Sequence, residues 1–209
     1  HVFSCMKDAI RWKPQAAIVC TPATDHLITA VQLTRENIAT LIEKPISNNL
    51  EKKELWGELE KRAHRVPVLV GYVLRHDACA KLVRENINKK ILGKIIEADF
   101  YCGSWLPDWR ADQDYRSCVS ARQELGGGVL LELSHEIDLA QWLLGPISLE
   151  HTYIGNSGLL EINAEDQAIL FGRTTDKTPV TIRLNFCTSP SKRTMEIRGS
   201  NGMIHWDLV

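Results

Sequence analysis

The segment from Gly126 to Asp138 holds residue types that can carry out acid–base chemistry on a small ligand. Three successive glycines lead into Glu132, Ser134, His135 and Asp138. Glycines let the backbone adopt positive φ or approach a ligand closely, and Ser134 is a favourable N-cap for a helix that would run to the next Gly-Pro pair. Glu132 and His135 are therefore expected beside the start of this helix, where they could share one ligand and move a proton. A glycine turn before an ordinary helix, with a capped histidine, is an equally weighted alternative.

A lysine follows a predicted strand over residues 39–43, in the sequence Glu43-Lys44-Pro45. Because proline excludes the preceding residue from the α region, the backbone at Lys44 is expected to be extended and its side chain well aimed. An aimed ammonium can relay a proton or stabilise a developing alkoxide. A surface Glu–Lys pair at the end of the strand is the commoner alternative.

The sequence Thr21-Pro22, with His26 four residues further on, lies between a predicted strand over residues 16–20 and a predicted helix. Ligands of open parallel sheets bind at the carboxyl ends of strands, where helix N–H groups are free. These residues are candidates for holding such a ligand. Ordinary turn and capping residues, with His26 in solvent, are the alternative.

A loop over residues 104–122 is dense in aromatic and charged side chains. Flat rings can lie against a sugar while charged groups take its hydroxyls, so this loop is the candidate for substrate specificity. A surface loop anchored by two buried tryptophans is the alternative. The loop holds Trp105, Asp108, Trp109, Arg110, Asp114, Tyr115, Arg116 and Arg122.

The elements that would position these residues form two groups, which predict an α/β protein of two domains, residues 1–75 and 76–209. The first group alternates helix and strand, which is typical of a parallel sheet covered on both faces. The second has a period of two and predicts an antiparallel meander in an α+β domain. Expected helices cover residues 6–12, 25–35, 50–65 and 78–91, and expected strands 16–20, 39–43, 66–72, 95–103, 149–154, 167–174, 179–187, 193–198 and 203–206.

Composition excludes several classes of protein. The formal net charge is −1, and no basic stripe suggests nucleic acid as a partner. No apolar run approaches the roughly 20 residues that span a bilayer, so no membrane segment is expected. The six cysteines include no Cys-x-x-Cys pair, so we expect them to be reduced and mostly packed in a cytoplasmic protein. No metal is expected, because Glu132, His135 and Asp138 follow one another along one segment and no further ligand is apparent.

The order of these motifs resembles the glucose-fructose oxidoreductase, inositol dehydrogenase and rhizopine-catabolism (Gfo/Idh/MocA) family over nearly the whole chain. The matching motifs are Thr21-Pro22 with His26, Glu43-Lys44-Pro45, Gly71-Tyr72 with Arg75, Gly93-Lys94-Ile95, the triple glycine with His135 and Asp138, and residues 196–202. The resemblance implies an NAD- or NADP-dependent oxidoreductase with an N-terminal Rossmann domain. It also implies a C-terminal domain whose open, mostly antiparallel sheet forms homodimers or homotetramers.

The resemblance also assigns roles to individual residues. It makes Lys44 and His135 the catalytic candidates, with Glu132 as a third. Glu132 ranks below them, because Leu131 stands where the family has an aspartate. The cofactor-binding candidates are Thr21, Pro22, His26, Glu43, Lys44 and Pro45, and the substrate-binding candidates are Arg75, Trp105, Trp109, Arg110, Tyr115, Arg122 and Asp138.

The expected reaction is hydride transfer between nicotinamide and a secondary alcohol of a sugar or polyol, with a faint similarity to enzymes of bacterial surface-sugar biosynthesis. The glycine fingerprint of dinucleotide-binding folds is absent from the 209 residues, and we expect the chain to be part of a longer one. The rival hypothesis is an inactive, cofactor-free binding or scaffold protein that keeps the oligomeric sheet.

Overall fold

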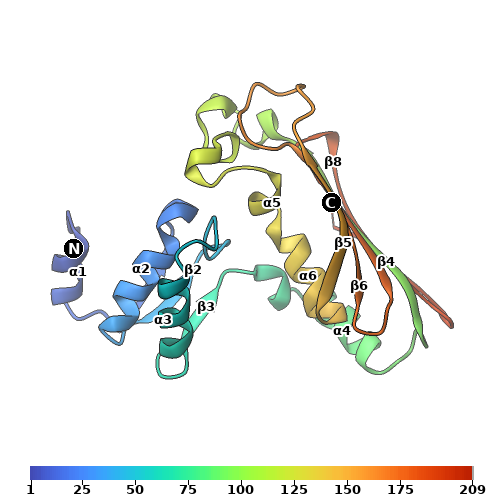
Figure 1. Ribbon diagram of the computed structural model, residues 1–209, viewed down its shortest axis with the longest axis horizontal. Coiled ribbons are helices and arrows are strands. Elements are labelled where there is room, and N and C mark those ends of the chain that lie inside the picture. Colours follow the sequence, from blue (N-terminus) through green and yellow to red (C-terminus); the bar gives the residue numbers. More distant parts are fainter. Residues whose placement is uncertain (209) are drawn as a thin grey trace. The chain divides into compact units, whose positions relative to one another are not determined.

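The computed structural model describes residues 1–208, which form two compact units (Figure 1). The first is His1–Gly71 and the second begins at Tyr72. Among the described residues, no helix has both the length and the apolar character that a bilayer crossing requires.

The N-terminal unit is a three-stranded parallel sheet in the order β1-β2-β3, as the alternation of helix and strand predicts. Helices α2 and α3 pack on the face that carries Val19 and Ile42, whereas Ile18 and Leu69 on the other face are exposed. The parallel sheet of the predicted Rossmann type is present, and the helices among the described residues of this unit cover one of its faces. Its elements are α1 (Met6–Arg11), β1 (Ala16–Val19), α2 (Ala23–Arg35), β2 (Ala39–Ile42), α3 (Lys53–Ala63) and β3 (Val68–Val70).

The C-terminal unit has helices on one face of a six-stranded sheet (Figure 1). Its regular elements are η1 (Val73–His76), α4 (Ala78–Asn88), β4 (Ile95–Trp105), α5 (Val129–Glu132), α6 (Ser134–Leu144), β5 (Ile147–Gly155), β6 (Gln167–Thr174), β7 (Pro179–Asn185), β8 (Cys187–Gly199) and β9 (Gly202–Asp207). Between β4 and α5 the chain forms four short 3₁₀ turns, Leu106–Trp109, Tyr115–Ser117, Val119–Ala121 and Gln123–Leu125.

The strand order is β5-β6-β7-β4-β8-β9, so the expected simple meander is wrong at one point. Strand β4 lies between β7 and β8, parallel to β7 and antiparallel to β8. All other pairs in this sheet are antiparallel. Strands that follow one another in the sequence often pair, but not always. Strand β4 takes a central place because Ala98, Phe100 and Cys102 form part of the buried core under the helices.

The expectation that the cysteines are mostly packed is wrong for half of them. Cys5, Cys20 and Cys79 are exposed, whereas Cys102 is buried. All six are free thiols. The spacing of the cysteines in the sequence does not predict their burial, because it carries no information on which face of an element a residue occupies.

The triple glycine is needed for close packing as well as for backbone conformation. Gly126 and Gly128 have φ values of 82° and 110°, as the sequence predicts. A Cβ on Gly127 would lie 2.1 Å from the carbonyl oxygen of Val119. The segment before α5 is therefore seated directly against the backbone of the preceding 3₁₀ turns.

Replacing Gly127 with Ala is expected to lower the free energy of unfolding of the C-terminal unit by about 3 kcal/mol, because backbone atoms must move to admit the methyl group. Urea unfolding measures the change. Gly57→Ala is the matched control: Gly57 lies inside α3 with open space around its Cβ position, so alanine is expected to stabilise by about 0.5–1 kcal/mol. A Gly127→Ala variant as stable as the wild type would contradict the close packing.

Candidate active site

His135 lies in the first turn of α6, where the chain passes from one short helix into the next. Leu133 links α5 to α6, and α6 begins at Ser134 with Leu133 in the capping position. The prediction that Ser134 is the N-cap is wrong by one residue, because the chain enters α6 directly from the short helix α5, which no local pattern in the sequence indicates. The side chain of His135 is 20% exposed, so it is largely enclosed by the protein.

Next to His135, a buried carboxylate forms an ion pair with an arginine from the sheet. The side chain of Glu136 is 1% exposed, and its Oε1 atom accepts a hydrogen bond of 2.6 Å from Nε of Arg193 on β8. Nη2 of Arg193 lies at the same distance from Oε1, without hydrogen-bond geometry. Nε2 of His135 is 3.4 Å from this oxygen. One carboxylate oxygen thus faces both a guanidinium and an imidazole.

Cys102 completes this cluster from the central strand. Cys102 on β4 is directly opposite Arg193 on β8, so both side chains leave the sheet on the helix-covered face. Burial, with a smaller contribution from the Glu136 carboxylate, raises the pKa of the Cys102 thiol to about 12, although the Arg193 guanidinium opposes the rise. The thiol is therefore neutral near pH 7. Ligand atoms of Cys102, His135 and Glu136 lie within 4.8 Å of one another, but a protonated thiol and a carboxylate already paired with guanidinium do not suit a metal ion.

Two of the predicted substrate residues bind each other. Arg75 donates from Nε and Nη2 to the two carboxylate oxygens of Asp138, at 2.8 and 2.5 Å. The pair joins the 3₁₀ turn η1 to α6, one turn beyond His135. Asp138 is 9% exposed and Arg75 45% exposed. The arrangement fixes the start of α6, and a substrate role for the two residues stays a prediction.

The predicted specificity loop is held by local contacts. Nε1 of Trp109 donates to Ser104 at 2.8 Å, and the indole meets the ring of Phe186 edge-on. Arg122 forms an ion pair with Glu124, and the Tyr115 hydroxyl accepts a hydrogen bond from the Glu161 amide. Trp109 is 37% exposed, so it is not one of the two buried tryptophans of the alternative interpretation. Trp105 packs partly buried on the core, and Arg110 is exposed.

In the N-terminal unit, two of the predicted motifs meet at one edge of the sheet. Val19 ends β1 and is in register with Ile42, which ends β2. Because the strands are parallel, Thr21-Pro22 and Glu43-Lys44-Pro45 follow at the same carboxyl edge. Lys44 is half-buried, and Glu43, Thr21 and Pro22 are exposed. No side chain caps α2 at Pro22, and the N–H groups of an uncapped first turn are where a helix can bind a ligand.

His26 connects these two loops. Its ring is 2% exposed, with Nδ1 2.7 Å from the carbonyl oxygen of Pro45 and Nε2 2.6 Å from that of Thr21. The alternative of a solvated His26 is therefore wrong. Backbone carbonyl oxygens contact both ring nitrogens. The ring therefore holds the two loops at this edge of the sheet in place.

Replacing His26 with Leu is expected to lower the free energy of unfolding by about 2–4 kcal/mol, because it leaves the Thr21 and Pro45 carbonyls unpaired. Hydrogen exchange of β1 and β2 amides should show the loss within the N-terminal unit. His64→Leu, at the exposed end of α3, is the control. Equal effects of the two substitutions would show that the bridge contributes nothing.

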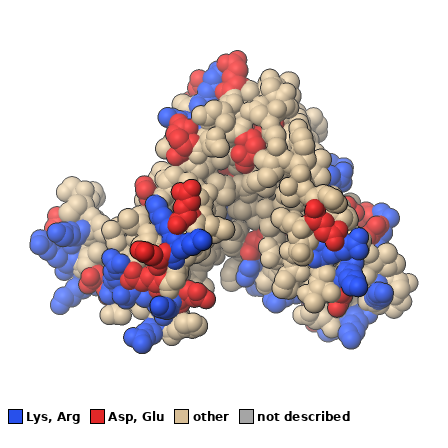
Figure 2. All heavy atoms as spheres, viewed as in Figure 1, with Lys and Arg blue, Asp and Glu red and all other residues tan. Residues whose placement is uncertain are grey.

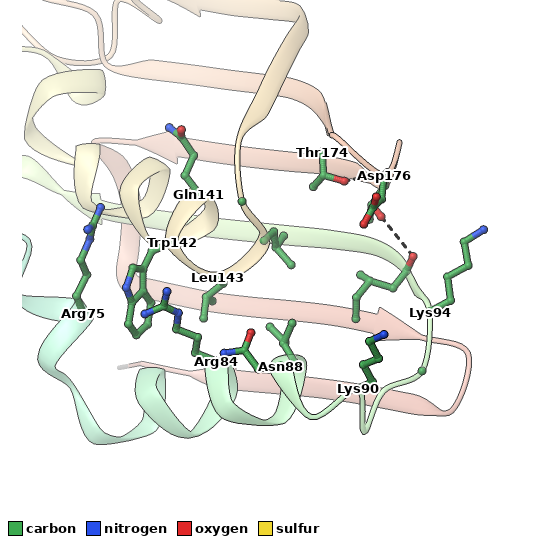
Figure 3. Close-up of a pocket in the computed structure, with 16 residues that line it drawn as sticks. Arg75, Arg84, Asn88, Lys90, Lys94, Gln141, Trp142, Leu143, Thr174 and Asp176 are labelled. Carbon is green, nitrogen blue, oxygen red and sulfur yellow. Dashed lines mark hydrogen bonds between the residues drawn. The ribbon is translucent and has the colours of Figure 1, made fainter.

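A separate cavity of about 1030 Å³ lies beside the last turn of α6, away from His135 in its first turn (Figure 3). Arg84 stacks over the ring of Trp142 at 4.3 Å, and Lys90 and Lys94 lie beside the start of β4. These cations stand near the carboxyl ends of α4 and α6, where positive charge offsets the helix dipole. The described residues that line this cavity include no histidine, so His135 marks the better candidate for acid–base chemistry.

Comparison with known proteins shows two family matches. Residues 2–72 match the family described as "Oxidoreductase family, NAD-binding Rossmann fold", and residues 80–205 match "GFO/IDH/MocA C-terminal domain". Among curated proteins, 2,7-anhydro-N-acetylneuraminate hydratase of Mediterraneibacter gnavus is 26% identical over 145 residues, which cover 68% of this chain and 37% of that protein.

Solved structures share the fold. The WlbA dehydrogenase of Bordetella pertussis, in complex with NADH and UDP-GlcNAcA, is 22% identical with a TM-score of 0.82 over 98% of this chain and 59% of that one. The myo-inositol 2-dehydrogenase of Lactobacillus plantarum is 17% identical with a TM-score of 0.81 over 98% of this chain and 61% of that one. The chain thus spans about six-tenths of these solved chains and a smaller share of the curated relative.

Proposed function

The chain belongs to the GFO/IDH/MocA oxidoreductase family, and from this premise we propose that the protein transfers hydride between NAD(P) and a secondary alcohol of a sugar or polyol. The observation that carries the proposal is the enclosed His135 above the Glu136–Arg193 pair, in the domain that matches the family's C-terminal domain. Relatives named for sugar and polyol dehydrogenation support the substrate class.

The residues of the N-terminal unit fit one part of the cofactor. The exposed Thr21-Pro22 turn, the uncapped start of α2 and the loop of Glu43, Lys44 and Pro45 share the carboxyl edge of a parallel sheet, which is where such sheets bind nucleotides. They would hold the nicotinamide end of NAD or NADP. When bound, the cofactor supplies the hydride acceptor or donor.

Proton transfer is assigned to His135 and Lys44. As hydride leaves the carbinol carbon, its hydroxyl proton must leave too, and a neutral imidazole near pH 7 is suited to accept it. A charged Lys44 ammonium would stabilise the developing alkoxide. The reverse assignment, with Lys44 as the proton acceptor and His135 polarising the oxygen, uses the same groups.

Titration of the intact protein with NADH and with NADPH, followed by nicotinamide fluorescence, tests the proposal against the rival of a cofactor-free scaffold. We expect a saturable signal with one or both cofactors, followed by turnover with a panel of polyols, inositols and uronic sugars. The absence of any saturable signal would favour the scaffold.

The outer face of the C-terminal sheet supports self-association into a homodimer or homotetramer. Tyr153 and Ile169 are paired across β5 and β6, and Met203 lies on β9; their exposed fractions are 52%, 45% and 52%. Figure 2 shows that charged side chains of both signs are interspersed on the face of the molecule that it views.

Replacing Ile169 with Glu is expected to shift the protein from oligomer to monomer, because it would place a charge in the apolar contact that Tyr153 and Ile169 would make with a second copy. Size-exclusion chromatography with light scattering measures the mass. Leu82→Glu, which adds the same charge on exposed α4, should leave the mass unchanged. A wild-type monomer at micromolar concentration would refute the proposed assembly.

A further inference from the structure

Three groups from three elements converge on one buried carboxylate oxygen. Oε1 of Glu136, on α6, lies 2.6 Å from both Nε and Nη2 of Arg193, on β8, and 3.4 Å from Nε2 of His135. Cys102, on β4, closes the cluster from below. Neither Glu136 nor Arg193 is among the catalytic, cofactor-binding or substrate-binding candidates that the sequence suggests.

We propose that Glu136 and Arg193 are a positioning pair for His135: the carboxylate orients the imidazole, and the guanidinium cancels the carboxylate's charge so that the imidazole stays neutral and able to accept a proton. The role of the pair in catalysis rests on the function proposed above. The electrostatic relation among the three side chains does not, and it can be measured without turnover.

The burial of the pair supports a role beyond stability. Burial in itself raises the pKa of Glu136, and the Arg193 guanidinium opposes that rise. Taking both charges out of water costs about as much as their attraction returns, so apolar residues of similar size would stabilise a fold at least as well. Such a pair directly beside a candidate general base is therefore better explained by what it does to that base.

The charges around His135 make the pair's effect predictable in sign. Alone, a carboxylate at 3.4 Å would favour the imidazolium, and alone, a guanidinium beside it would disfavour it. When both are present, their opposite effects on protonation of the imidazole nearly cancel. Three other titratable groups lie on neighbouring elements. The Cys102 thiol on β4 is neutral because its pKa is about 12, and Asp138 is paired with Arg75 of η1. Glu132 on α5 is the same in all the variants below, so it does not affect their comparison.

Two single substitutions should therefore shift the titration of His135 in opposite directions. Glu136→Gln leaves the guanidinium alone and is expected to move the midpoint down by about one pH unit. Arg193→Met leaves the carboxylate alone and is expected to move it up by about the same amount. The double variant should return near the wild-type midpoint. NMR of the His135 imidazole in the intact protein measures the titration midpoint of the wild type and of the three variants.

Kinetics then separate positioning from charge. The acidic limb of the kcat/KM profile should follow the same opposite shifts, since the base must be neutral to act. The double variant, with charge balance restored but no carboxylate to orient the ring, should lose about tenfold or more in kcat with KM little changed. Arg193→Lys keeps the positive charge and should keep the midpoint.

A lone buried charge can unfold a domain, so if either single variant does not fold, Arg193→Lys and the double variant decide the question. Shifts in the same direction, no shift in folded single variants, or wild-type kcat in the double variant would overturn the positioning role. Opposite NMR shifts in a protein that shows no turnover with any cofactor would instead refute the dehydrogenase proposal and leave the electrostatic relation standing.

Discussion

His135→Asn is expected to lower kcat about 10²–10⁴-fold, which is the usual contribution of a positioned general acid or base. Asparagine keeps a hydrogen-bonding side chain of similar reach in the first turn of α6 but cannot accept the hydroxyl proton. The neighbouring Glu136–Arg193 ion pair remains intact, so the fold should persist. Stopped-flow absorbance of NADH formation, with the best substrate found in the titration panel, measures the loss.

The pH dependence distinguishes lost chemistry from lost binding. In the wild type, the acidic limb of the kcat/KM profile reports protonation of the base, and in His135→Asn this limb should disappear. His205→Asn is the control, because His205 lies on β9 on the sheet face away from the helices and is half exposed. Unchanged kcat in His135→Asn, with an unchanged acidic limb, would remove His135 from the reaction.

Local patterns in the sequence predict most of the elements well. The apolar run at residues 16–20 and the helical spacing at residues 25–35 became β1 and α2 with ends shifted by one or two residues. This accuracy follows from short-range rules, since strand and helix periods are set by neighbouring residues. Long-range pairing is not local, and for this reason the place of β4 between β7 and β8 was missed.

The residues of the candidate site show the same difference between local and long-range information. His135 and Lys44 could be named from motifs because each stands in a short, recognisable segment. Arg193 could not, since it is 57 residues from Glu136 and reaches it only because β8 pairs with β4 under α6. Likewise, a helix position could not reveal that His26 is buried between two backbone carbonyls. What the sequence lacks in both cases is the partner brought near by folding.

Lys44→Met is expected to lower kcat by about 10³-fold or more, because the methionine side chain is of similar length but carries neither charge nor proton. Met leaves the Lys44–Pro45 backbone and its hydrogen bond to His26 unchanged, so the N-terminal unit should keep its stability and its affinity for NADH. Lys53→Met, at the exposed start of α3, is the matched control. Turnover at the wild-type rate in Lys44→Met would exclude the lysine from catalysis.

Lys44→Arg decides which of its two possible roles the lysine performs. Arginine is always protonated, so it can stabilise an alkoxide but cannot take up or relay a proton. If Lys44 acts only through its charge, Lys44→Arg should recover a large part of the activity that Lys44→Met loses. If Lys44 is the proton acceptor, both variants should be equally impaired, and the acidic limb should disappear with Lys44→Arg rather than with His135→Asn. Lys44→Arg and His135→Asn together thus identify the residue that accepts the proton, because only titration of that residue produces the acidic limb of the pH profile.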